Sequence, residues 1–330
     1  MKSVSCKYIN ITEFNTNIMA DGSNLYTLFP KSREDLIYFI DAEIRKHGNA
    51  ADLNHIDVSK VEDFSGVFAW THFCGDISKW DVSNARTMAG MFEDADAFDG
   101  DISDWDVSSV ENMSCMFKNA KSFNTDISGW DVSRVKYMQY MFYGSNFDMD
   151  IDTWDIRNVI DMSFMFAHCS FNRNLKRWNP KNVTSMERMF LMNKVFDQDI
   201  SKWNVSNVKR MSGMFANGVF NHDISEWDVS HVYTMANMFH CNVKFNHDIS
   251  DWDVRGVTDF SDMFSSTEYP HISKMSKWNP LNAKNISSFL PENTKNEDIS
   301  FIRDIWPKKM KFPEKCIGLE EYIEKLDTSR

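Results

Sequence analysis

The sequence predicts an α/β repeat solenoid of about ten repeats, each 24 to 26 residues long, with a cap at both ends. The main observation is the spacing of tryptophan, which recurs every 24 to 26 residues, a period typical of stacked-repeat proteins. The recurring residues are Trp80, Trp105, Trp130, Trp154, Trp178, Trp203, Trp227, Trp252 and Trp278. In eight successive repeats a Met-Phe pair follows eleven and twelve residues after the Trp. Repeat length varies only after this pair, where we expect a surface loop.

Each repeat is expected to contain one short parallel β-strand and one short helical or 3₁₀ segment. Apolar residues alternate with period two around the tryptophan, as in Trp130, Asp131 and Val132, and β-branched residues favour a strand. From Val135 to Phe142 the apolar residues are spaced by three, three and one, which suits one or two helical turns with one face inward. Stacking the repeats then places a parallel sheet on one side of the solenoid.

Three domains are expected: an N-terminal helical cap (1–52), the repeat solenoid (53–290) and a C-terminal cap (291–330). Ser32 is a typical N-cap residue, and an acidic first turn, a basic last turn and Gly48 together predict a helix between the two. The first and last repeats are atypical, as the ends of a stack require. The stretch GLEEYIEKLD predicts a short helix in the C-terminal cap.

The repeats carry a family resemblance. Segments such as DISKWDVSNARTMAGMF, DISDWDVSSVENMSCMF and DISGWDVSRVKYMQYMF resemble the repeats of BspA-like bacterial surface proteins, a branch of the leucine-rich-repeat proteins. The resemblance covers about residues 53 to 290. It implies a curved, leucine-rich-repeat-like solenoid that binds other proteins or cell surfaces and has no catalytic activity.

Composition narrows the classes of partner. The chain has 36 basic and 48 acidic residues and a net charge of -12, which disfavours nucleic acid because phosphate binding needs clustered Lys and Arg. Six cysteines without paired spacing indicate buried free thiols in a reducing compartment. No signal peptide and no apolar run of about 18 residues is found, so we expect no membrane insertion. The expected location is cytoplasmic by sequence and cell-surface or secreted by resemblance, and we expect a monomer without cofactors.

A column of carboxylates is the first candidate feature. If a Trp and the Val two residues later point into the core, the residue between them points outward, about 5 Å from its neighbours in adjacent repeats. Asn179 and Asn204 hold this position in two repeats, and the carboxylates are Asp81, Asp106, Asp131, Asp155, Asp228 and Asp253. Stacked like charges repel, so the column needs a reason. Each Asp accepts hydrogen bonds that shape a turn, or the column faces a basic partner, or it binds Ca²⁺.

The residue just before each Trp varies while the frame stays fixed, which is typical of recognition positions or of a merely solvated surface. Together with the carboxylates, these positions give the expected partner-binding set: Lys79, Asp81, Asp104, Asp106, Asp131, Asp155, Arg177, Lys202, Glu226, Asp228, Asp251 and Asp253. The sequence therefore predicts a non-catalytic module that binds a macromolecular partner, expected to be a protein, through the exposed face of the sheet.

The alternatives are a carbohydrate or cell-surface adhesin exported by a route other than the Sec pathway, a purely structural spacer, and a metal-dependent protein. His222 and His247 hold the same position in adjacent repeats, each beside an Asp, and two His with two Asp are a possible zinc ligand set. We find no phosphate-binding loop, no nucleophile elbow and no Ser-His-Asp arrangement that the repeat register supports. We therefore expect neither catalytic residues nor a metal site.

Overall fold

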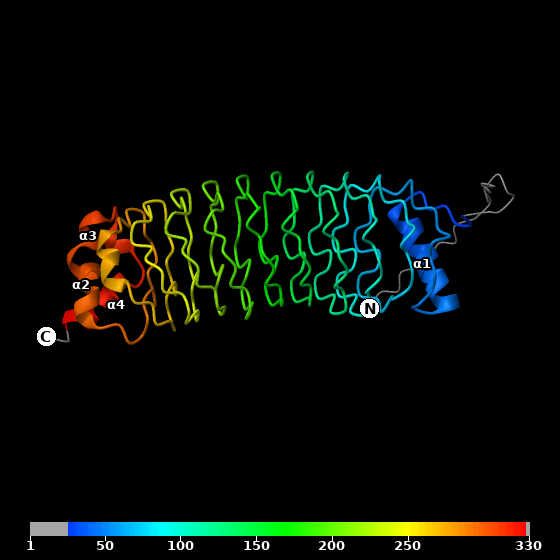
Figure 1. The fold of residues 1–330 in the computed structure, drawn as a ribbon. Coiled ribbons are helices and arrows are strands. Elements are labelled where there is room, and N and C mark those ends of the chain that lie inside the picture. Colours follow the sequence, from blue (N-terminus) through cyan, green and yellow to red (C-terminus); the bar gives the residue numbers. More distant parts are fainter. Residues whose placement is uncertain (1–25, 328–330) are drawn as a thin grey trace.

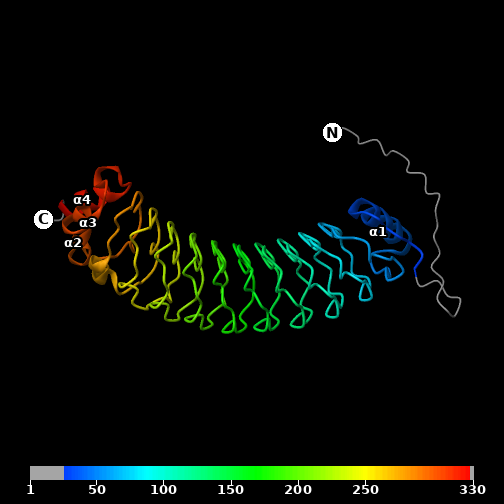
Figure 2. The same cartoon turned by 90° about the horizontal axis from the view of Figure 1, so that it is seen from above.

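A computed structural model describes residues 26–327 of the protein (Figure 1). The chain winds into successive coils that stack side by side along one axis, with helices only at the two ends. Seen from above, the stack bends into an arc with a concave and a convex side (Figure 2). The helices are α1 (Arg33–His47), η1 (Ile272–Lys277), α2 (Asn296–Asp304), α3 (Trp306–Lys309), η2 (Pro313–Lys315) and α4 (Leu319–Asp327).

The predicted β-strands are absent, and the α/β, leucine-rich-repeat-like fold class is therefore wrong. Residues 26–327 contain no strand, and neighbouring repeats share only isolated parallel bridges, such as the one between Asn112 and Tyr137. Around Trp130 the backbone turns twice, because the Trp130 N–H donates to the Ile127 carbonyl (3.2 Å) and the Val135 N–H to the Val132 carbonyl (2.9 Å). The alternating burial that indicated a strand comes from these two turns.

The predicted helical segment is absent as well. Its residues form what we call the turn ladder, the segment from seven to fourteen residues after each Trp, for example Tyr137–Gly144. Alternate N–H groups close tight turns, such as Met141 to the Met138 carbonyl at 3.1 Å. The N–H groups between them donate to the next repeat, such as Tyr140 to the Ser163 carbonyl at 2.9 Å. The backbone is thus satisfied without a helix or a sheet.

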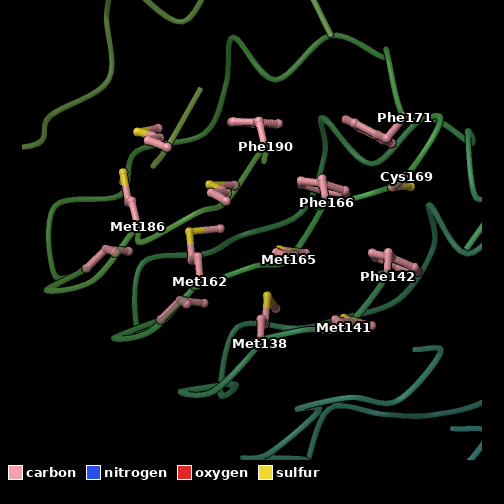
Figure 3. Packing of buried hydrophobic residues seen from close by; sticks show 14 of the residues in the cluster. Met138, Met141, Phe142, Met162, Met165, Phe166, Cys169, Phe171, Met186 and Phe190 are labelled. Carbon is pink, nitrogen blue, oxygen red and sulfur yellow. The ribbon is translucent and has the colours of Figure 1, made fainter. Parts of the chain in front are cut away.

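The core follows the sequence prediction. The Trp side chains and the eight Met-Phe pairs are buried. Equivalent Met and Phe side chains of neighbouring repeats lie above one another (Figure 3). Each indole N–H donates to a carbonyl of the preceding repeat, as Trp130 does to Ile102 at 3.1 Å. Ten tryptophans make this bond at 3.0 to 3.3 Å, from Trp80 to Trp306. A Phe at this position could not, which explains why the column is Trp.

The turn ladder lies on the concave side. Backbone hydrogen bonds of a parallel ladder hold neighbours about 4.8 Å apart. In the column of the Met-Phe pairs, the Phe rings of neighbouring repeats, from Phe68 onward, have centres 5.5 to 5.9 Å apart. Stacked Trp rings have centres 6.2 to 6.5 Å apart. The repeat spacing therefore grows from the ladder toward the Trp column, as an arc requires. Figure 2 agrees, because η1, which ends just before Trp278, lies on the convex side.

Both ends of the stack are covered. The helix expected after Ser32 is α1, with the Ser32 hydroxyl accepting from the Asp35 N–H at 3.1 Å, and its residues Leu36 and Ile40 are buried in the core. At the other end Trp306 of α3 extends the Trp column, with its ring 6.5 Å from that of Trp278. The helix expected in the C-terminal cap is α4.

The cysteines among residues 26–327 are free thiols, as expected, and Cys6 lies outside the described residues. Not all of them are buried, because Cys74 is exposed. Burial raises the pKa of the Cys169 thiol to about 11.

Candidate functional site

Two columns of the turn ladder have a left-handed backbone. In the eight repeats from Trp80 to Trp252, the residues ten and fourteen positions after the Trp have φ between 53° and 65°. Glycine adopts this conformation without strain and Asn or Asp at low cost, whereas a bulky side chain costs roughly 1–2 kcal/mol. In most repeats the columns hold small or polar residues, such as Gly90, Gly213 and Asn237. Their backbone geometry therefore favours residues of that kind.

In the middle of the array these columns hold large side chains instead. Tyr140, Phe164 and Arg188 occupy the first column in three successive repeats, and His168 and Met192 occupy the second. Each tolerates a left-handed φ of 53° to 60° that Gly or Asn would adopt more easily. Backbone strain kept at several neighbouring positions is typical of functional sites.

These side chains form one group on the concave side, which we call the concave cluster: Tyr140, Tyr143, Phe164, His168 and Arg188. The rings of Tyr140 and Phe164 stack at 4.4 Å and 9°. Tyr143 lies 5.1 Å from the ring of His168, and the Arg188 guanidinium lies 5.4 Å from the centre of the Phe164 ring. Desolvation by its neighbours raises the pKa of Tyr140.

Exposed apolar side chains extend the cluster on the same face. Tyr137 and Met192 are each 41% exposed, and Ile160 is 37% exposed. Tyr137 lies in the column of parallel bridges, and Met192 is one of the left-handed residues. The concave side thus carries an aromatic and apolar surface over three successive repeats.

A polar depression adjoins the cluster. The Glu187 carboxylate joins the two, since it lies 2.8 Å from Arg188 and 3.4 Å from Arg210. Arg210 also donates to the Ser185 hydroxyl at 3.2 Å. The depression is lined by Asp161, Thr184, Ser185, Lys209, Arg210 and Tyr233.

The residues singled out from the sequence lie elsewhere. The column just before each Trp lies on the convex side, which is the side of η1, the helix that ends directly before Trp278. The Asp column directly follows the Trp. Each of its carboxylates accepts a hydrogen bond from the backbone N–H of the residue two positions later, at 3.0 to 3.2 Å. These residues are Asp81, Asp106, Asp131, Asp155, Asp228 and Asp253. Asn204 makes the same contact at 3.2 Å without a charge.

These hydrogen bonds are the ones that the turn interpretation of the Asp column expects. Hydrogen bonds from the Ser108 hydroxyl and N–H lower the pKa of Asp106. In Asp155 and Asp253 the side chain of an Arg two residues on contributes most to lowering the pKa.

The variable residues before each Trp are not gathered into one site. Lys79, Asp104, Lys202 and Glu226 are exposed in separate repeats. Asp251 pairs with Lys277 at 2.9 Å. One depression does bring two of the predicted residues, Asp155 and Arg177, together with Asp152 and Asn179. Whether these residues bind a partner stays a prediction.

The histidine pair does not form a metal centre. His222 Nε2 lies 2.9 Å from the Asp197 carbonyl, and His247 Nε2 lies 3.1 Å from the Asn221 carbonyl, so each ring turns back onto the preceding repeat. Within the described part of the chain, no group of three or more His, Cys, Asp or Glu side chains is placed to hold a metal ion. Nor does any helix between residues 26 and 327 have the length and apolar character to cross a membrane.

A family model matches the repeats and most of the chain. It is described as Mycoplasma protein of unknown function, DUF285, and it matches residues 38–147, 144–219 and 217–301. The chain belongs to the DUF285 family. This corrects the resemblance to the BspA-like, leucine-rich-repeat proteins. The comparisons with curated proteins and with solved structures gave no match.

The concave cluster was missed by the sequence analysis of this DUF285 chain. A signal was present, since the residue ten after the Trp changes from Gly and Cys to Tyr140, Phe164 and Arg188 and then back to Gly213. A helix is expected there from the sequence, and in a helix these positions have no left-handed φ that would make a large side chain unusual.

Proposed function

We propose that the protein is a non-catalytic module that binds a macromolecular partner, a protein, through the concave side of its repeat array. The observation that supports this most is the occupation of left-handed positions by Tyr140, Phe164 and Arg188. Stacking of the repeats does not require a large side chain there, because Gly90 and Gly213 make the same hydrogen bond to the next repeat (2.7 and 2.8 Å) as Tyr140 does (2.9 Å).

The composition of the surface favours a protein. Tyr, Arg and Met are enriched at protein interfaces, and the few residues that dominate binding are most often Trp, Tyr and Arg. The concave surface offers Tyr137, Tyr140, Tyr143, Arg188 and Met192 together. A concave shape also lets residues from several repeats contact one partner at once.

The carbohydrate alternative fits less well. Sugars stack on open ring faces, but here the Phe164 ring is stacked with Tyr140 on one side and covered by Arg188. Tyr137 keeps an exposed ring, so the alternative is tested beside the proposal rather than dropped.

The test is an affinity capture from lysates that compares three forms of the chain. One is native, one carries Tyr140→Asn, Phe164→Asn and Arg188→Asn, and the third carries the convex-side charge reversals Lys79→Glu, Arg177→Glu, Lys202→Glu and Glu226→Lys. Asn is chosen because Asn237 already holds this column at φ 59°. All three forms are first shown to melt alike.

We expect a protein held by the native and convex-side forms and lost by the Asn form. Loss with the convex-side form alone would instead assign binding to the residues first predicted from the sequence. Capture that neither variant changes contradicts both surfaces.

A further inference from the structure

The charge of the concave side changes along the array. In the four middle repeats, the residues six to ten positions after the Trp include four cations, Lys136, Arg188, Lys209 and Arg210, and two carboxylates, Asp161 and Glu187. Lys136 is paired with Glu111 of the preceding repeat at 2.7 Å, so the excess of cations lies around Lys209 and Arg210. The chain as a whole has a net charge of -12. The basic surface around the concave cluster is therefore a local exception in an acidic protein.

Carboxylates of the protein itself neutralise only part of this positive charge. Glu187 is shared by two guanidinium groups, at 2.8 Å from Arg188 and 3.4 Å from Arg210, so one carboxylate serves two cations. Lys209 lines the depression beside Arg210, and its side chain is exposed. Asp161, the remaining carboxylate of the depression, accepts from the Ser163 N–H at 2.8 Å.

Hydrogen-bonding groups surround the same spot. The hydroxyl groups of Thr184, Ser185 and Tyr233 line the depression, and Tyr233 is 44% exposed. Two cations with neighbouring hydroxyl groups suit a carboxylate, which accepts hydrogen bonds with both oxygens. The apolar rings of the concave cluster lie directly beyond Glu187 and Arg188.

We propose that the partner contributes an acidic peptide segment, with an apolar side chain on the concave cluster and a carboxylate in the depression beside Lys209 and Arg210. This rests on the proposed function and deepens it by naming the partner's chemistry. A nucleic acid fits less well, because binding it takes a longer run of cations than Lys209 and Arg210 provide.

The test is a selection from a random peptide library on the immobilised native chain, with counter-selection on the Tyr140→Asn, Phe164→Asn, Arg188→Asn form. Peptides of about ten residues span about 33 Å when extended, enough to reach from the cluster across the depression. The best peptides are then synthesised, and their affinity is measured with the native chain and with two double variants. One is Lys209→Glu with Arg210→Glu, and its matched control is Lys79→Glu with Lys202→Glu, which changes the charge equally on the convex side.

We expect the selected peptides to combine net negative charge with aromatic or aliphatic residues. The Lys209, Arg210 variant should weaken their binding by about tenfold and the control by less than about twofold. The native affinity should fall as salt rises from about 50 to about 300 mM, because screening weakens charge contacts.

Neutral or basic selected peptides, equal weakening by the two double variants, or no enrichment over the counter-selected form would each overturn the inference. Binding of a sulfated glycan in place of peptides would overturn it as well. The lysate capture separates this from the proposed function. If the Asn form loses the captured protein but the Lys209, Arg210 variant retains it, only the acidic-peptide proposal is refuted. If the Asn form retains the captured protein, both proposals are refuted.

Discussion

Replacing Phe164 with Asn should leave the fold about as stable as before while impairing binding. The substitution removes the Tyr140 stack, worth about 0.5–1.5 kcal/mol, and the Arg188 contact, worth about 0.5–1 kcal/mol at an exposed site. It also relieves a left-handed backbone at φ 58°, which costs a bulky residue roughly 1–2 kcal/mol. These terms cancel within about 1 kcal/mol.

The assay is urea unfolding followed by circular dichroism, with Met165→Ala as the matched control. Met165 is the next residue and is fully buried, so its truncation should cost about 2–5 kcal/mol. If Phe164→Asn destabilises the protein as much as Met165→Ala does, then Phe164 is a structural residue and the strain argument fails.

Three further predictions concern the array itself. Trp130→Phe removes the indole hydrogen bond to the Ile102 carbonyl, which still accepts from the Trp105 N–H at 3.2 Å, and should cost about 0.5–1.5 kcal/mol in urea unfolding; an unchanged midpoint would show that the indole bond contributes nothing. The pKa of Asp106 is lowered in the folded state, so its stabilising effect is full above about pH 4 and is lost as pH falls through the folded pKa. Asp106→Asn, which copies the residue found at Asn204, should therefore reduce acid sensitivity below about pH 4, and equal acid sensitivity in melting scans would contradict this. Removing residues 1–52 should expose the first repeat and cause aggregation, and a soluble truncation that melts cooperatively would refute a capping role.

The sequence predicted what depends on apolar periodicity. Burial of the Trp column and the Met-Phe pairs follows from their strict register, and the helix after Ser32 follows from its cap, charge pattern and Gly48. Both features depend on residues close together in the sequence: the apolar positions of one repeat, and the ends of one helix.

The local backbone could not be read from the same pattern. Trp130, Asp131 and Val132 alternate in burial both in a strand and in two tight turns. The turns are distinguished by their hydrogen bonds, from the Trp130 N–H to the Ile127 carbonyl (3.2 Å) and from the Val135 N–H to the Val132 carbonyl (2.9 Å). The apolar spacing from Val135 to Phe142 likewise fits a helix as well as the turn ladder. The ladder is set by hydrogen bonds between repeats, which a single repeat does not reveal.

The binding surface was misplaced for that reason. A strand at the Trp column would have made the residues beside it the open face, which led to Arg177 and the carboxylates. In the structure the open concave face lies about ten residues later in each repeat, where Tyr140 and Phe164 lie.

Photo-crosslinking from two positions of one repeat tests the central claim most directly. A benzophenone amino acid replaces Tyr137, exposed on the concave side, or Gly129, whose position on the convex side has open space around an added side chain. We expect the captured protein to crosslink to position 137 and not to position 129. Crosslinking from position 129 alone would contradict binding through the concave side and return the binding surface to the convex side.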